Sequence, residues 1–239
     1  MNILLELVED ENKDLKLYVP EEKSLKDISE LVEKIKGLDI KVVRTERISY
    51  EQTKLIWCLC QEYGELDGYT SGEMREVLEN EFCIEKDLEY FSISPNKKNA
   101  CSSKVATEFI QFIIEHSIKH GFDIRIPEGQ GEKRRLRSAR EVVPEIKRYI
   151  IACLRVKKCV VCGRVEGVDL HHSPALGVPY EQDDGRKTGF MSLCRECHTK
   201  AHSIGLKEFE SKYHLEPVWL SDGLIRELKK IYTNHFQAF

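Results

Sequence analysis

The chain has 239 residues, of which 41% are hydrophobic and 33% are charged, and its formal net charge is −4. This composition excludes a mainly disordered protein, and the length allows one large domain or two small ones. No apolar run approaches the ~20 residues that span a bilayer, and the first residues lack the basic flank and the cleavage site of an export signal. We therefore expect a cytoplasmic protein that does not enter a membrane. In that compartment the nine cysteines favour reduced thiols, some of them metal ligands, over disulfides.

The first half of the chain predicts an α+β region over residues 1–125. Alternating apolar residues indicate short strands at 3–7 and 15–19, followed by a capped helix from Ser24 to Lys36 and a third strand at 38–43. This order forms a ββαβ unit. Ser49 then caps an amphipathic helix, and further helices are expected over 71–81 and 102–120. Between these two helices, the stretch YFSIS at 90–94 predicts a strand.

Residues 126–144 combine Pro, Gly and charge with little periodicity, as in an inter-domain linker. Charge also changes here: residues 1–100 carry 23 acidic and 14 basic side chains, whereas residues 133–158 carry 10 basic and two acidic ones. Such a basic cluster attracts a polyanion through counterion release, which makes DNA the expected partner and Arg134, Arg135 and Arg137 its candidate contacts. The alternative is a solvated linker that binds nothing.

The second half, residues 145–239, begins with an amphipathic helix from Pro144 to about Lys157 and continues into two CxxC pairs. The pairs are Cys159 with Cys162 and Cys194 with Cys197, separated by 31 residues. Four thiolates suit tetrahedral Zn²⁺, so these pairs predict a structural zinc site with an insertion between its two halves. The alternative is a thiol redox protein that uses one CxxC pair.

Four histidines lie within and just after this insertion. His198 and His202 are four residues apart on an expected helix, so they share one face and can point at one ion. His171 and His172 follow an extended-looking segment, where adjacent residues of a regular strand face opposite ways and a bulge would let both approach one substrate. One of them can then bind the ion while the other takes a proton from water. The alternatives are a further zinc ligand, surface histidines and a simple turn.

The segments CVVCG, DLHH and SLCRECHTKAH, in this order over residues 158–205, resemble the HNH nucleases with a ββα-metal core held by two zinc knuckles. The resemblance is closer to the HNH nucleases encoded by bacteriophages. It implies a small zinc-stapled ββα domain and an endonuclease that hydrolyses DNA with one divalent cation, Mg²⁺, Mn²⁺ or another transition ion. By position, His171, His198 and His202 would hold this ion and His172 would be the general base. Structural zinc would be held by Cys159, Cys162, Cys194 and Cys197.

One position departs from that family. An Asn usually lies five residues before the third cysteine, and this chain has Gly189 there. Either a nearby group such as Asp183 or Asp184 substitutes for it, or the site is weakened. Arg164, Arg186 and Lys187 lie near the histidines in sequence and are candidates for holding a phosphate, with solvated surface charge as the alternative.

Residues 47–121 are similar to the NinB or Orf-type recombination proteins of phages. That resemblance implies binding to single-stranded DNA, a role in phage recombination or DNA processing, and single-strand binding or recombination proteins as partners in the host cytoplasm. The competing interpretation of the whole chain is a zinc-containing recombination mediator that binds DNA without cutting it.

Overall fold

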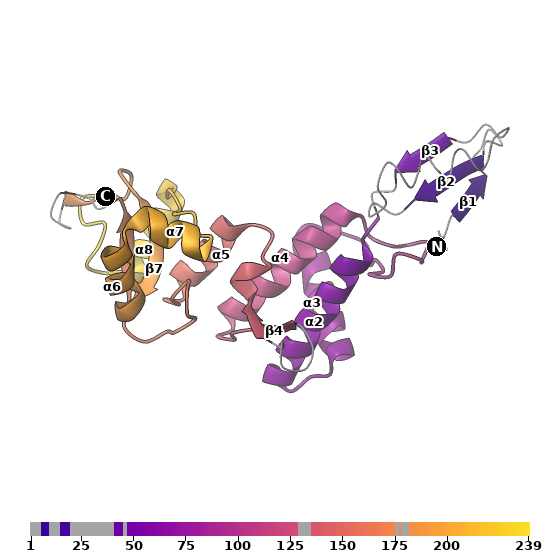
Figure 1. Ribbon diagram of the computed structural model, residues 1–239, viewed down its shortest axis with the longest axis horizontal. Helices are drawn as coiled ribbons and strands as arrows, with labels where there is room; N and C mark the ends of the chain where they lie inside the picture. Colours follow the sequence, from indigo (N-terminus) through magenta and orange to yellow (C-terminus); the bar gives the residue numbers. More distant parts are fainter. Residues whose placement is uncertain are drawn as a thin grey trace. The chain divides into compact units, whose positions relative to one another are not determined.

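The computed structural model describes residues 47–128, 135–174, 177 and 182–239, together with the backbone of three strands before them. Two compact units make up the chain. One contains Met1–Trp57 and Glu79–Phe109, and the other contains Cys58–Leu78 and Ile110–Phe239. Among the described residues, no helix is long and apolar enough to cross a membrane. Helices and small sheets alternate along the chain, which confirms the predicted α+β class (Figure 1).

Three strands near the N-terminus form one sheet in the order β1-β2-β3. Strand β1 (Glu6–Glu9) is antiparallel to β2 (Leu15–Val19), and β2 is parallel to β3 (Lys41–Arg44). The three predicted strands are therefore confirmed, with somewhat different ends. The predicted helix from Ser24 to Lys36 lies outside the described residues.

Helices α2 (Tyr50–Asp67), α3 (Ser71–Lys86) and α4 (Ser103–Lys119) confirm the three helices predicted in the first half. The first of them begins with a reciprocal cap, in which Gln52 N donates to Ser49 Oγ at 3.1 Å and Ser49 N donates to Gln52 Oε1 at 3.0 Å. This cap satisfies two backbone amides that have no partner inside the helix. The predicted start at Ser49 is therefore confirmed.

The strand predicted at 90–94 is wrong. Ser92 forms an isolated bridge with Ala100, and the chain between them turns back on itself. The apolar alternation has another cause, because Ile93 is buried and Phe91 packs edge-on against Phe82 and Phe109, with ring centroids 6.2 and 5.7 Å apart. Side chains of a loop that fill a core can thus imitate the pattern of a strand.

The segment predicted as a linker contains regular structure. Strand β4 (Arg125–Glu128) pairs with β5 (Arg135–Ser138), and the 3₁₀ turn η2 (Ala139–Glu141) follows. The hairpin also pairs its own charges, because Glu128 accepts from Arg135 at 2.6 Å and from Arg137 at 2.9 Å. Composition alone missed this pairing, since Pro is tolerated in an edge strand. The division into residues 1–125, 126–144 and 145–239 remains a prediction.

The C-terminal elements build a hairpin followed by helices. Strand β6 (Val168–Ser173) is antiparallel to β7 (Gly189–Cys194) in an unbroken register from Val168 opposite Cys194 to Ser173 opposite Gly189. Helix α6 (Arg195–Ile204) packs against both strands, and α5 (Ile146–Arg155) packs against β7. Helix α7 (Leu206–Tyr213) lies on α6, and α8 (Asp222–Ile231) lies on α5.

Asp123, in the turn after α4, connects that turn to the CVVC loop. Its carboxylate pairs with Arg125 Nε at 2.6 Å and with Lys158 Nζ at 3.0 Å. Lys158 is 3% exposed, so its ammonium depends on this carboxylate and on the carbonyl of Phe122 at 2.9 Å. The same carboxylate touches the loop at Gly163, whose φ is +76° and where a Cβ would lie 2.8 Å from Asp123 Oδ1. Charge and close packing together fix the CVVC loop in place.

We expect Asp123→Asn to lower the free energy of unfolding by about 1–3 kcal/mol, because it leaves the buried ammonium of Lys158 without its carboxylate. The measurement is urea denaturation followed by circular dichroism. The control is Glu227→Gln, which removes an exposed ion pair with Arg155 and should change stability by less than about 1 kcal/mol. Equal effects of the two substitutions would show that Asp123 does not stabilise Lys158.

Candidate metal centres

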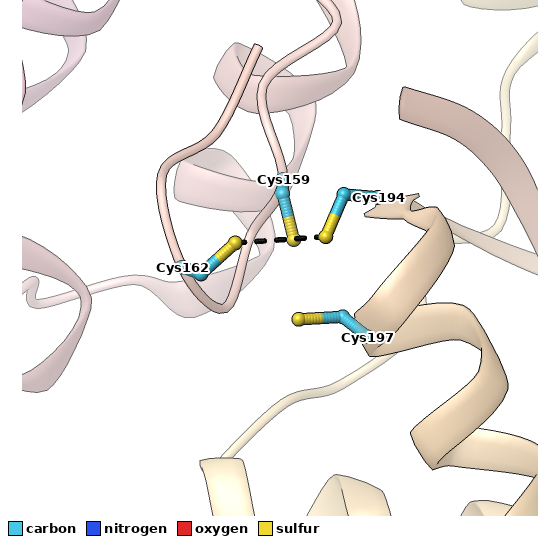
Figure 2. Close-up of side chains that lie close together, drawn as sticks. All are labelled: Cys159, Cys162, Cys194 and Cys197. Carbon is cyan, nitrogen blue, oxygen red and sulfur yellow. Dashed lines mark hydrogen bonds between the residues drawn. The ribbon is translucent and has the colours of Figure 1, made fainter. Parts of the chain in front are cut away.

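The four cysteines of the CxxC pairs converge on one point (Figure 2). Cys159 and Cys162 come from the loop after α5, Cys194 ends β7, and Cys197 lies in the first turn of α6. All four Sγ atoms lie within 4.8 Å of one another, and those of Cys162 and Cys194 are 3.6 Å apart. Tetrahedral zinc with Zn–S bonds of about 2.3 Å places its sulfurs about 3.8 Å apart. The arrangement therefore fits one zinc ion held by four sulfurs.

The protonation state of one of these thiols, Cys159, also suits a metal. The pKa of Cys159 is lowered to about 5, first by the hydrogen bond from the Cys197 thiol and then by backbone N–H groups of the two knuckles. Burial opposes this shift and is outweighed. Cys159 is therefore a thiolate at neutral pH, which is the form that binds metal.

A second cluster joins His171 of β6 to His198 and His202 of α6. One nitrogen of each ring lies within 4.8 Å of the others, and the ring centroids are 4.7, 5.6 and 4.8 Å apart. The sequence predicted this convergence from the spacing of the two helix histidines. The strand contributes the third ring because α6 packs directly on β6.

His171 is buried in a way that requires an explanation. It is 2% exposed, and neither ring nitrogen has a hydrogen-bond partner in the part of the chain that the structure describes. Leaving buried polar atoms unpaired costs about 1–3 kcal/mol. Burial, followed by the neighbouring imidazoles, lowers the pKa of His171 to about 3, so the ring is neutral and offers a lone pair. A cation bound by the three rings would give one of the two nitrogens of His171 a partner.

His172 lies on the other face of the hairpin. The ladder of β6 with β7 has no bulge, and it pairs His171 with Met191 and His172 with Phe190. Successive residues of such a strand point to opposite faces. His172 Nε2 accordingly lies 3.1 Å from Asp183 Oδ2, and its ring centroid is 5.4 Å from that of His235. The structure therefore brings together His171, His198 and His202, with His172 in a separate group.

Sequence reasoning missed His235, which comes from the C-terminal segment 232–239. Three contacts hold this segment against the hairpin side of the unit. Tyr232 donates its hydroxyl to the carbonyl of Leu154 at 3.1 Å, and Ala238 N donates to the carbonyl of Asp183 at 3.2 Å. Phe236 is fully buried, with its ring centroid 5.4 Å from that of Phe190. No spacing rule links His235 to His172, so only the fold reveals their proximity.

Close packing explains the glycine at position 189. A Cβ there would lie 2.7 Å from Pro217 Cβ and 3.1 Å from the carbonyl oxygen of Ser173. Val218, which follows that proline, exchanges backbone hydrogen bonds with Phe190 at 2.9 Å. An Asn at this position would therefore not fit. Next to this glycine, the Thr188 hydroxyl donates to the carbonyl of Pro174 at 2.6 Å and so connects the two ends of the loop between β6 and β7.

The predicted DNA-contacting side chains are dispersed, and most are paired. Arg164 pairs with Glu196 and Arg186 with Asp222, each at 3.0 Å. Lys187 is exposed, Arg135 and Arg137 pair with Glu128 as described above, and Arg134 lies outside the described residues. Exposed ion pairs are worth about 0–1 kcal/mol, so such pairs can exchange a carboxylate for a phosphate. Their role in DNA binding remains a prediction.

Comparison with known proteins bears on the identity of the two clusters. A family model described as "Putative HNHc nuclease" matches residues 19–232. Neither the curated proteins nor the solved structures that were compared include a match. The family match spans both halves of the chain and includes every cysteine and histidine of the two clusters.

We expect Gly189→Asn to destabilise the C-terminal unit by about 1–3 kcal/mol, because the new side chain would collide with Pro217 and the strand opposite. Urea denaturation would measure the loss. Gly223→Asn is the matched control, since a Cβ at that position has nothing closer than 4.0 Å. A variant at position 189 that is as stable as the control would refute the steric explanation.

Proposed function

Because the chain belongs to the HNHc nuclease family, we propose that it is a metal-dependent endonuclease that hydrolyses phosphodiester bonds of DNA. The observation that carries this proposal is the convergence of His198 and His202 on His171, whose two ring nitrogens are buried and have no hydrogen-bond partner in the described part of the chain. His171 is followed in β6 by His172, whose ring contacts the buried carboxylate of Asp183.

His171, His198 and His202 are the proposed ligands of the catalytic cation. Three imidazoles favour a transition ion such as Mn²⁺ over Mg²⁺, which prefers oxygen ligands. When bound, the ion supplies positive charge that stabilises the negative charge developing on the phosphate and on the departing 3′ oxygen.

His172 is the proposed general base. If its Nε2–H donates to Asp183, Nδ1 keeps its lone pair and can accept a proton from the attacking water. Burial lowers the pKa of His172, and the carboxylate opposes this shift. The ring is therefore neutral at pH 7, as a base must be. Asp183 acts as a positioning residue that fixes the tautomer of His172.

The proposed cation ligand His171 and the proposed base His172 lie on opposite faces of β6, and both can act on one phosphate only if it binds at an open edge of the sheet. In the described sheet β6 pairs with β7 alone, so its other edge carries no strand. We propose that a DNA backbone lies along this edge, between the cation on one face and His172 on the other. This geometry replaces the bulge that the sequence analysis considered.

The four cysteines are proposed to hold structural zinc. Cys194 ends β7 and Cys197 begins α6, so the zinc site clamps the turn that sets the helix histidines against β6. A redox role is not favoured, since all four sulfurs form one cluster. Loss of the zinc should therefore also displace His198 and His202 from His171.

We expect Cys194→Ser to release zinc and to unfold the C-terminal half, because such a small unit gains much of its stability from metal binding. Elemental analysis and circular dichroism would measure the two effects. The control is Cys58→Ser, a half-buried cysteine outside the cluster, which should retain as much zinc as the wild-type chain. Native circular dichroism in zinc-free Cys194→Ser would contradict the structural role.

We expect His172→Ala to lower kcat for cleavage of plasmid DNA in Mn²⁺ by about 100-fold or more, the usual contribution of a general base. Asp183→Asn should cause a smaller loss, because the ring is kept but its tautomer is no longer fixed. DNA binding, measured by electrophoretic mobility shift, should be unchanged in both variants. The control is His214→Asn, at an exposed position with φ of +51° that Asn tolerates.

The proposal fails if the wild-type chain shifts DNA in the gel but yields no metal-dependent product. That result would support the competing function, a zinc-containing mediator that binds DNA without cutting it. Cleavage that survives in a His198→Ala, His202→Ala double variant would also contradict the proposal, since it would place the reaction elsewhere.

A further inference from the structure

The face of the hairpin that carries His172 holds a third group of metal-ligating side chains. His172, Asp183 and His235 each offer one ligand atom, and these atoms lie within 4.8 Å of one another. The group shares no residue with the other two clusters. Its donor set is two imidazoles and one carboxylate, which is a set that binds Zn²⁺ with one position left open.

The charge of this group is unbalanced. Asp183 is 0% exposed, and its carboxylate contacts His172 Nε2 at 3.1 Å and the backbone N–H of Gly185 at 2.8 Å. Within the described part of the chain, no Lys or Arg forms an ion pair with it. A carboxylate removed from water is costly unless a cation accompanies it. A metal ion between the two imidazoles would supply the missing positive charge.

The ligands are also held in place before any ion arrives. The carbonyl of Asp183 accepts a hydrogen bond from Ala238 N. Two residues further along, Gly185 packs so closely against Phe236 that a Cβ at this position would lie 2.9 Å from the Phe236 ring. His235 precedes Phe236, whose ring is fixed against Phe190. His235 itself is only partly buried, which leaves a route for an ion to enter.

We propose that His172, Asp183 and His235 form a second cation site, distinct from the His171 cluster, that binds Zn²⁺ or a similar transition ion. The site has a consequence for catalysis that rests on the proposed function. An ion bound to His172 Nε2 displaces the proton from that nitrogen, and the neutral ring then carries its proton on Nδ1. Nδ1 can no longer accept a proton from water, so occupation of this site inhibits cleavage.

The binding half of the proposal is tested without activity, in the His198→Ala, His202→Ala double variant, which lacks two of the three ligands of the His171 cluster. After equilibration with Zn²⁺ and removal of excess ion, elemental analysis should find two zinc ions per chain, one of them in the cysteine cluster. Adding His235→Gln should reduce the count to one, whereas adding His214→Asn should leave it at two. When the same proteins are loaded with Co²⁺ instead, His235→Gln should leave the thiolate-to-cobalt charge-transfer bands of the cysteine cluster unchanged, because the ion that it removes has no sulfur ligand.

One zinc ion in the double variant, or two ions that persist after His235→Gln, would overturn the proposal. Circular dichroism and retention of the cysteine-bound zinc show that His235→Gln is folded. Asp183→Asn in the same background provides a second variant, and it too should bind one ion.

The inhibitory half is tested by cleavage in saturating Mn²⁺ with increasing Zn²⁺. Wild type and His235→Gln should cleave equally without zinc, and the zinc concentration for half inhibition should rise at least about tenfold in the variant, as expected for a lost ligand. Equal inhibition of both proteins would overturn this half, since zinc would then act elsewhere. Absent cleavage in both proteins, with the zinc counts as expected, would refute the proposed nuclease and leave the second site standing.

Discussion

The unbroken antiparallel ladder between β6 and β7 is the constraint on which the functional part of the molecule depends. Its register places Cys194 at the end of one strand, beside the CVVC loop, and the histidine pair near the end of the other. Because β6 has no bulge, the side chains of the consecutive residues His171 and His172 point to opposite faces of the sheet. One face then receives α6 with His198 and His202, and the other receives Asp183 and the C-terminal segment. A shift of one residue in the register would exchange the two histidines and separate each from its partners.

Much of the candidate site could be predicted because its chemistry is encoded in short spacings. A CxxC pair, or two histidines four residues apart on a helix, can reach one ion through local structure alone. The sequence therefore indicated Cys159, Cys162, Cys194, Cys197, His198 and His202. The helix caps are equally local, as Ser49 and Gln52 show. His235 could not be found in this way, since it meets His172 only after the 62 residues between them have folded back.

The failures have the same origin in long-range packing. Residues 90–94 alternate like a strand because Phe91 and Ile93 fill a core from a loop, and no partner strand was detectable from the sequence. The strand pairing within the predicted linker, 126–144, was missed because its cross-strand pairs, Glu128 with Arg135 and Arg137, depend on a hairpin that composition does not reveal. The reason for a glycine at position 189 could not be seen either, since it lies 28 residues away, at Pro217.

Residues 232–239 follow both CxxC pairs in the chain, and this order affects how the C-terminal unit assembles during translation. Translation proceeds from the N-terminus, so both knuckles, the hairpin and α6 leave the ribosome before His235 and Phe236. Until those residues emerge, Phe190 lacks its contact with the ring of Phe236, and the backbone of Asp183 lacks the amide of Ala238. The nascent chain can thus acquire its sulfur-bound metal before the surroundings of His172 are complete.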